Sequence, residues 1–204
     1  WPFATLGWPN QTTDLARYYP NSLMVTGSDI IFFWVARMVM AGYHFMGEAP
    51  FAHIYFTSIV RDAQGRKMSK SLGNSPDPLA MMEKYGADSV RFCMVQTPTG
   101  QDLLFDEKRL ESGKFFANKL WNATKLVNMR MGDEDLSGVK ESQLRLTLAD
   151  RWILSRFANA VKDVTRNLKT YRFAESAQAV YHFAWNEYCD WYLEMAKPRW
   201  ALAD

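Results

Sequence analysis

Residues 65–74 read Gly-Arg-Lys-Met-Ser-Lys-Ser-Leu-Gly-Asn. They lie between a strand-like stretch, His53 to Val60, and the proline-rich start of a helix at Pro76 to Pro78. The segment places two ammonium groups, those of Lys67 and Lys70, on one loop. Such a loop can close over a polyphosphate and neutralise the negative charge that builds up as pyrophosphate leaves. The segment therefore predicts a phosphate-binding loop.

A lysine- and serine-rich stretch can also be an ordinary solvated turn. Here Gly65 lies before the lysines and Gly73 lies after them, and glycines at both ends give a loop inexpensive hinges. The order of the residues, rather than their composition, favours the functional interpretation.

The composition predicts a compact protein of one or two domains, because 48% of the 204 residues are hydrophobic and 15% are aromatic. The longest apolar stretch, Ile30 to Met46, is interrupted by Arg37 and His44 and is too short to cross a bilayer. We therefore expect no membrane partner. Cys93 and Cys189 lie far apart without metal-type spacing, which predicts no zinc site and a cytoplasmic, reducing setting.

The N-terminal half alternates strand and helix signals. We expect a strand over Ser22 to Thr26, a turn and helix cap at Gly27 to Asp29, and an apolar helix over Ile30 to Ala41. Amides at a helix start that follows a parallel strand commonly hold nucleotides. Further along, Asp77 followed by proline predicts a capped helix, and a second helix is expected over Asp88 to Met94.

Beyond Pro98 to Gly100 the alternation stops and three helical patterns follow, which predicts domains 1–100 and 101–204. We expect a linker at Gly132 to Ser142 and a last helix over Phe173 to Lys197 that ends at Pro198. Two apolar stripes have helical spacing: Phe116, Leu120, Ala123 and Val127, then Ile153, Phe157, Val161, Val164 and Leu168.

The net charge of +2 does not by itself indicate a nucleic-acid partner, but the charges are unevenly distributed. Four basic residues project within about 60° of one another on the second helix, opposite its apolar stripe: Arg151, Lys162, Arg166 and Lys169. This face can follow phosphates or be solvated. For the aromatic residues of the last helix, we expect packing rather than base stacking.

The loop at residues 65–74 resembles the signature loop of class I aminoacyl-tRNA synthetases. Together with Val25 to Asp29 and Asn118 to Asn122, it makes essentially the whole chain resemble the valyl-tRNA synthetases. The stretches Asp29 to Met38 and Cys189 to Glu194 are the most similar to valyl enzymes.

The resemblance implies an α/β remnant of a Rossmann-like catalytic domain, followed by an all-α anticodon-binding bundle, and a mostly helical chain. The parent would be a monomeric valine–tRNA ligase that uses ATP with Mg²⁺ and transfers valine to tRNA(Val). The start at Trp1, without an initiator methionine or a basic leader, suggests a fragment. The sequence lacks the His-x-Gly-His motif of the family's first catalytic half, so we expect it to be inactive alone.

The resemblance also implies roles for individual residues. Lys70, supported by Lys67, would be catalytic and contact the ATP phosphates, as part of an ATP-binding loop that includes Met68, Ser69 and Ser71. Gly27 would let the backbone approach the adenosine, and the Asp29 carboxylate would accept hydrogen bonds from the ribose. Trp34 would form a wall of the amino-acid pocket. Taken without the resemblance, Asp29 is a good first residue for a helix and Trp34 an ordinary core residue.

In the helical half, we expect Asn118, Lys119 and Asn122 to contact tRNA, because amides can read base edges while a lysine holds phosphate. The asparagines can equally cap or bridge helices. Two alternatives to the valyl function stay open: an isoleucyl- or leucyl-tRNA synthetase, and a non-catalytic helical RNA-binding module.

Overall fold

The computed structural model describes all residues except 1, 134–136, 141–143 and 201–204, and all described side chains except those of Pro2 and Lys70. The chain divides into two compact units, which we describe separately. Unit 1 comprises Trp1–Ile59 and Thr99–Asp102, and unit 2 comprises Val60–Pro98 and Leu103–Asp204. The loop at residues 65–74, called the lysine loop below, thus belongs to the same compact unit as the helical half. The division into family domains 1–100 and 101–204 stays a prediction.

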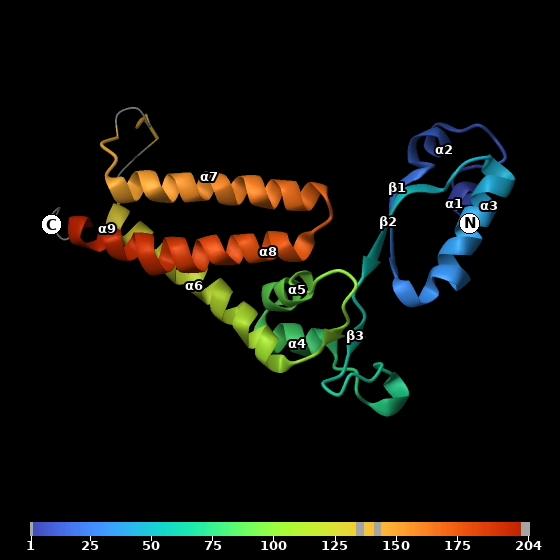
Figure 1. The fold of residues 1–204 in the computed structure, drawn as a ribbon, viewed down its shortest axis with the longest axis horizontal. Coiled ribbons are helices and arrows are strands. Elements are labelled where there is room, and N and C mark those ends of the chain that lie inside the picture. The colour runs from blue at the N-terminus through green and yellow to red at the C-terminus, as the bar shows by residue number, and fades with distance from the viewer. Residues whose placement is uncertain (1, 134–136, 141–143, 201–204) are drawn as a thin grey trace. The chain divides into compact units, whose positions relative to one another are not determined.

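Unit 1 is built on two parallel strands joined by a helical crossover (Figure 1). Its elements are α1 (Pro2–Thr5), α2 (Thr13–Tyr18), β1 (Asn21–Gly27), the 3-10 turn η1 (Ser28–Ile30), the π-helical turn η2 (Ile31–Val35), α3 (Ala36–Met46) and β2 (Phe51–Thr57). Asn21 lies opposite Phe51 at one end of the strand pair, and Gly27 lies opposite Thr57 at the other. Parallel strands require such a crossover, and β1–α3–β2 provides it.

The N-terminal residues pack as an aromatic cluster against α3. The ring of Phe3 lies 5.6 Å from that of Trp8 and 5.7 Å from that of Tyr19, both in edge-to-face geometry. Glycine is needed at position 42, since an added Cβ would lie 2.9 Å from both Pro50 Cδ and the Tyr19 hydroxyl oxygen. Helix α3 is therefore packed closely against the segment that leads into β2.

Unit 2 contains a short parallel strand pair, the lysine loop and the long helices (Figure 1). Its elements are β3 (Val60–Arg61), the 3-10 turn η3 (Lys70–Leu72), α4 (Pro78–Tyr85), α5 (Ala87–Val95), β4 (Leu103–Leu104), α6 (Glu107–Met131), α7 (Leu148–Lys169), α8 (Phe173–Tyr181), the π-helical segment η5 (His182–Tyr192) and α9 (Leu193–Trp200). The predicted cap of α4 is confirmed, because the Asp77 carboxylate accepts the Leu79 N–H at 3.0 Å and Pro78 opens the helix.

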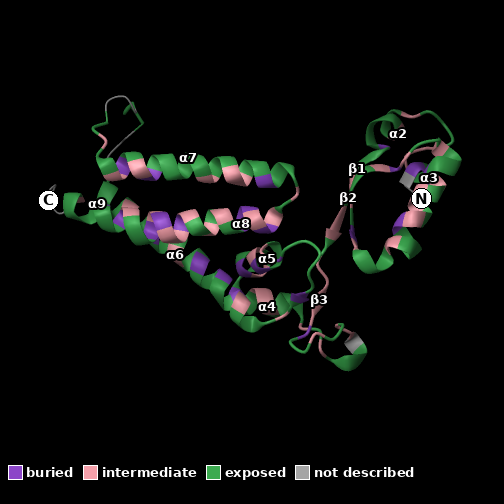
Figure 2. Cartoon of the chain, in the orientation of Figure 1, coloured by how far each residue is buried: buried purple, intermediate pink, exposed green. Residues whose placement is uncertain are grey.

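Two apolar clusters hold unit 2 together. One joins α4, α5 and α6 through Tyr85, Cys93 and Leu110, and the fully buried Leu110 lies at its centre. The other joins α6 to the last helices through Ala123, Cys189 and Leu193. In Figure 2 the buried positions of α6 and α8 face their neighbouring helices. Burial of these apolar side chains is the main term that fixes the long helices.

Several predicted boundaries and faces were wrong. The strand expected at residues 53–60 ends at Thr57, and Val60 begins a separate strand that pairs with β4. The last helix runs past Pro198 to Trp200. Its final turn is held because Arg199 bonds Asp150 and Trp200 packs on the second cluster, which offsets the hydrogen bond that proline lacks.

The apolar stripe predicted for α7 is only partly buried. Ile153 is buried, but 52% of Phe157 and 47% of Leu168 are exposed, because helices cover only one side of α7 within the described chain. The linker predicted at residues 132–142 falls between α6 and α7, and parts of it, 134–136 and 141–142, lie outside the described residues.

Candidate active site and RNA-binding helices

One candidate site, in unit 1, is the turn where β1 passes into α3. Gly27 ends the strand with an ordinary negative φ of −82°. Within the described chain, a Cβ added there would meet only the Ile59 side chain, with Cδ1 at 3.6 Å and Cγ1 at 3.8 Å, which are normal contacts. Neither backbone conformation nor packing within the described chain demands glycine at this position. What its missing side chain provides is an open approach to the backbone.

Asp29 and Trp34 follow on the same turn. Asp29 lies in η1 and is exposed, and no side chain caps this turn, so the helix-cap interpretation of Gly27 to Asp29 is not what the structure shows. Trp34 lies in η2 and is 50% exposed, so it is not an ordinary core tryptophan within the described chain. A π-helical turn at the start of a helix is uncommon and is often found at functional sites. The structure thus leaves a carboxylate and an indole ring accessible beside the open backbone of Gly27.

A separate candidate site, in unit 2, is the lysine loop, which is shaped by glycines at both of its ends. Gly65 has φ +77° and Gly73 has φ +63°, in the left-handed region that favours glycine. The backbone conformation of the loop therefore explains why glycine lies at both of its ends. Lys67 is exposed, Met68 is half-buried, and the hydroxyls of Ser69 and Ser71 are hydrogen-bonded to each other at 2.6 Å. The backbone of Lys70 begins η3, but its side chain lies outside the described part of the structure.

The base of the loop holds two side chains that the sequence analysis missed, Asp62 and Asn74. The Asp62 carboxylate accepts hydrogen bonds from the backbone N–H of Arg66 at 2.8 Å and from its Nε at 2.7 Å. Asn74 Nδ2 donates to Asp62 Oδ2 at 2.9 Å. The hydrogen bond from Asn74, helped by those from Arg66, holds the pKa of Asp62 at about 2, although burial opposes this. Asp62 is therefore a carboxylate at neutral pH.

A sequence signal for these two residues existed. Aspartate and asparagine at the two ends of a glycine-containing loop are residues that bond nearby backbone N–H groups.

The predicted tRNA contacts lie together on α6. Asn118 and Asn122 are exposed. Lys119 is half-buried, pairs with Asp190 and has its ammonium 4.0 Å from the centroid of the Trp185 ring. Its charge is therefore engaged inside the bundle, and a structural role competes with the predicted contact to phosphate.

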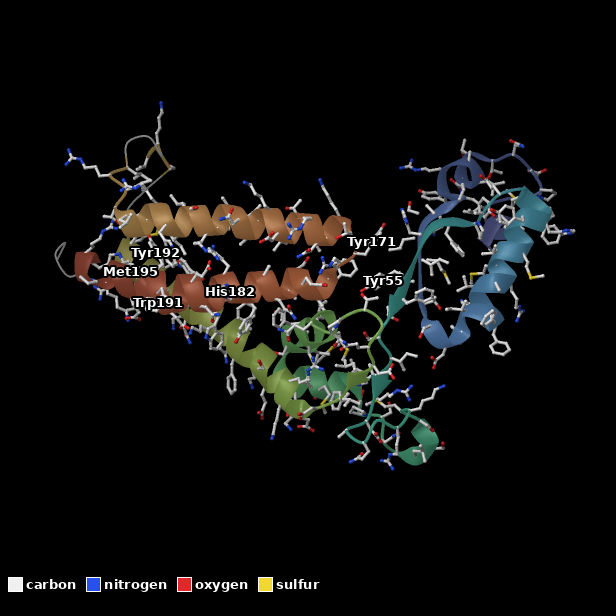
Figure 3. The ribbon with its side chains drawn as sticks, in the orientation of Figure 1. Tyr55, Tyr171, His182, Trp191, Tyr192 and Met195 are labelled. Atoms are coloured by element: carbon white, nitrogen blue, oxygen red, sulfur yellow. The ribbon has the colours of Figure 1, made fainter. Side chains whose placement is uncertain are left out.

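The exposed face of α7 carries the four predicted basic residues, and its start is fixed by a network around Asp150. Asp150 is buried and belongs to a capping box with Thr147. Tyr192, which points into the space between η5 and α7 in Figure 3, donates its hydroxyl to Asp150 at 2.9 Å. Arg199 donates to both carboxylate oxygens at 2.8 Å.

These bonds decide the ionisation of Asp150. Burial alone would raise the pKa of its carboxyl, but the hydrogen bonds from Thr147, supported by Arg199, lower the pKa to about 2. Burial and the bond to this carboxylate together raise the pKa of Tyr192 to about 12. The network is thus an ionised carboxylate held by neutral and cationic donors.

The described residues provide neither a metal centre nor a membrane-spanning helix. No group of three or more histidine, cysteine, aspartate or glutamate side chains in this part of the chain could hold a metal ion. No helix in the same part is long and apolar enough to span a membrane.

Comparison with protein families gives two matches, separated by residues 107–149. Residues 1–106 match the family described as tRNA synthetases class I (I, L, M and V). The chain belongs to the class I tRNA synthetases. Residues 150–203 match the anticodon-binding domain of tRNA ligases. In this synthetase chain, the lysine loop lies within the first match and the basic face of α7 lies within the second.

Among curated proteins, the synthetase chain is similar to valine–tRNA ligases. It is 51% identical to that of Thermotoga maritima over 201 residues and 52% identical to that of Carboxydothermus hydrogenoformans over 200 residues. Each match covers 98% of this chain and 23% of the relative. The predicted resemblance to valyl-tRNA synthetases is confirmed, and the chain spans less than a quarter of the relatives' length.

Solved structures of synthetases share the fold. Methionyl-tRNA synthetase of Mycobacterium tuberculosis bound by methionyl-adenylate superposes with a TM-score of 0.76, at 24% identity over 95% of this chain and 38% of that one. The LeuRS–tRNA–LeuAMS complex of Agrobacterium radiobacter gives 0.73, at 20% identity over 86% of this chain and 24% of that one. The predicted fold class is confirmed: a Rossmann-like remnant of a class I catalytic domain and a helical domain.

Proposed function

We propose that this chain is part of a valine–tRNA ligase that activates valine with ATP and transfers it to tRNA(Val). The observation that carries the proposal is the loop Lys67 to Ser71, formed on a glycine-hinged and hydrogen-bonded base, in a chain half identical to valine–tRNA ligases along its length. The chain supplies the ATP-binding loop and the anticodon-binding helices. The methionyl-adenylate complex of a protein with this fold supports an adenylate-forming chemistry.

In the activation step, a carboxylate oxygen of valine attacks the α-phosphorus of ATP, which reaches the enzyme with Mg²⁺. The bond from that phosphorus to the bridging oxygen breaks, the electron pair leaves with pyrophosphate, and valyl-adenylate forms. Lys70, assisted by Lys67, neutralises the charge on the departing pyrophosphate. The reaction needs alignment and charge stabilisation rather than a protein nucleophile.

The turn after β1 provides the adenosine, ribose and valine contacts of the full-length enzyme. The backbone at Gly27 approaches the adenosine, the exposed Asp29 carboxylate accepts hydrogen bonds from ribose hydroxyls, and Trp34 forms a wall of the valine pocket. Support comes from Gly27, where the fold itself does not require glycine, and from the exposure of both side chains.

The helical half binds tRNA(Val). Asn118 and Asn122 of α6 are exposed and can read base edges, and the basic face of α7 can follow phosphates. Lys119 is the weaker candidate for a direct contact because Asp190 and Trp185 already engage it. We also propose that the full-length enzyme acts as a cytoplasmic monomer, in keeping with two buried free cysteines.

The test is ATP–pyrophosphate exchange by the full-length protein with single amino acids. Valine is expected to support faster exchange than isoleucine, leucine or methionine at equal concentration. Charging of tRNA(Val), but not of tRNA for isoleucine, should follow. Faster exchange with isoleucine would replace the valyl proposal by an isoleucyl one, and no exchange with any of the four would leave a non-catalytic RNA-binding module.

A further inference from the structure

The two ends of the lysine loop are joined by one side-chain pair. Asn74 Nδ2 donates to Asp62 Oδ2 at 2.9 Å, and Asp62 is only 7% exposed. The same Asn74 amide also bonds the backbone of the loop. Its Oδ1 accepts the N–H of Ser69 at 2.9 Å, and its Nδ2 donates to the carbonyl of Lys67 at 3.2 Å. A single amide thus holds the chain on both sides of Met68, inside the motif.

Asp62 holds the other side of the loop. Its Oδ1 accepts the backbone N–H groups of Gln64 at 3.1 Å and Arg66 at 2.8 Å, and its Oδ2 accepts Arg66 Nε at 2.7 Å. The Asp62 N–H donates in turn to the Arg66 carbonyl at 3.0 Å. With Asn74 included, each oxygen of this buried carboxylate has two donors, so both ends of the loop converge on one charged group.

We propose that Asp62 and Asn74 are positioning residues that set the backbone of the lysine loop for pyrophosphate departure. They act through the main chain of Lys67 and Ser69 and do not touch the nucleotide. This inference rests on the proposed function, and it adds two residues that lie outside the Lys67 to Ser71 motif.

The physical reason is preorganisation. Cationic groups stabilise a transition state most when their backbone needs no rearrangement as the charge develops. Loss of the Asn74 amide removes the bond to the Ser69 N–H, the bond to the Lys67 carbonyl and the bridge to Asp62 together. The loop then samples more conformations, so ordering it in the transition state costs more free energy. The valine pocket at the β1 turn keeps all its groups.

The test uses the full-length protein with Asn74→Ala and Asp62→Asn. Each variant is expected to lower kcat for valine-dependent ATP–pyrophosphate exchange at least tenfold and to leave the KM for valine within twofold. Asn74→Asp is a second variant of nearly equal volume. It keeps an acceptor for Ser69 but places a carboxylate beside that of Asp62, so it should lose kcat as well.

The matched control is Asp77→Ala. Asp77 lies three residues after Asn74, and its carboxylate also accepts a backbone N–H, that of Leu79, but it caps α4 instead of bonding the loop. This variant should lower the thermal midpoint and leave kcat within twofold. A purely structural role for Asn74 would make the two variants behave alike.

Two further measurements separate the inference from the proposed function. The double variant Asp62→Asn/Asn74→Ala should lose no more than about threefold beyond the worse single variant, because both remove one shared contact. Trypsin should cut after Lys67 or Lys70 at least tenfold faster in Asn74→Ala than in the wild type.

Unchanged kcat and unchanged cleavage in Asn74→Ala and Asn74→Asp would overturn the inference, as would multiplicative losses in the double variant. If the wild type shows no amino-acid-dependent exchange, the proposed function fails, and the trypsin comparison still shows whether the pair holds the loop.

Discussion

Lys67 and Lys119 differ in how far their charges are already engaged by neighbouring residues. Lys67 is exposed on a loop whose backbone is held by neighbouring hydrogen bonds. Lys119, also chosen from the sequence, pairs with Asp190 and lies over the Trp185 ring. Spacing and residue type could not distinguish them, because Asp190 is 71 residues from Lys119 and meets it only in the folded bundle. The lysine loop was predictable since its residues are contiguous.

Lys119→Met tests the structural role of this lysine. The change keeps most of the apolar stem and removes the ammonium, so it should lower the stability of the helical half by about 1 kcal/mol through lost ion-pair and cation–π attraction. Chemical unfolding followed by helical circular dichroism measures it. Lys125→Met, at an exposed position of the same helix, is the control and should change stability by less than about 0.5 kcal/mol.

A further outcome of these variants concerns RNA. Suppose that Lys119→Met leaves stability unchanged but lowers the affinity of the full-length enzyme for tRNA(Val), and that this loss of affinity grows as the salt concentration is lowered. The ammonium then contacts phosphate, and the structural account of this residue is wrong.

Among the elements, helices α5 and α6 cross at a point that admits no side chain on α6. A Cβ at Gly113 would lie 3.0 Å from both the Cα and the carbonyl oxygen of Ser89, and Ser89 is buried. Backbone atoms cannot move aside as the end of a flexible side chain can. Gly113 is therefore a packing residue of the helix pair.

Gly113→Ala should destabilise the protein by about 1–3 kcal/mol, because the two helices must separate to admit the methyl group. The sign of this change in stability is informative, because alanine in place of glycine at an unhindered helix position stabilises a protein by about 1 kcal/mol. Ser112→Ala, at the exposed neighbouring position, should have little effect. A thermal midpoint that rises in Gly113→Ala would show that the crossing is looser than described.

The start of α7 predicts a dependence of stability on pH. The pKa of Asp150 is about 2 in the folded protein, against an ordinary value of 3.8. The folded state therefore favours the carboxylate. The stabilisation that ionised Asp150 gives the folded state is fully present above about pH 4 and is lost as the pH falls toward 2. Its size is about 2 kcal/mol.

Asp150→Asn checks this dependence. The variant should be less stable than the wild type at pH 6, and the difference should shrink as the pH is lowered from 4 toward 2. Denaturant titrations at four pH values suffice. A difference that stays constant across this range would mean that the ionisation of Asp150 does not contribute.

The elements differ in how far the sequence determines them. β1 and the caps of α4 and α7 depend on local patterns, and the predicted positions of β1 and of the α4 cap were confirmed. The turn of α9 beyond Pro198 depends on contacts between distant residues, the bonds from Arg199 to Asp150, which no local pattern contains.

At the scale of the whole molecule, the chain is less than a quarter as long as its valine–tRNA ligase relatives, and unit 1 shows corresponding exposed apolar surface. Phe32 is 82% exposed and Phe33 is 75% exposed within the described chain. Large exposed apolar side chains in neighbouring positions typically mark a surface that contacts other protein. Such a surface agrees with a chain that spans less than a quarter of its relatives' length.

The 204 residues alone should therefore show no valine-dependent ATP–pyrophosphate exchange under conditions in which the full-length enzyme is active. The reason is that the resemblance implies a second ATP-contacting motif, His-x-Gly-His, which this sequence does not contain. Exchange by the 204-residue chain within a hundredfold of the full-length rate would show that the lysine loop and the β1 turn suffice.

The central claim is that the ammonium groups of one loop stabilise departing pyrophosphate, and Lys70→Ala in the full-length enzyme tests it most directly. Pre-steady-state formation of valyl-adenylate should slow at least a hundredfold, about 2.7 kcal/mol of barrier, with the affinity for valine unchanged. Adenylate formation within tenfold of the wild-type rate would contradict the claim.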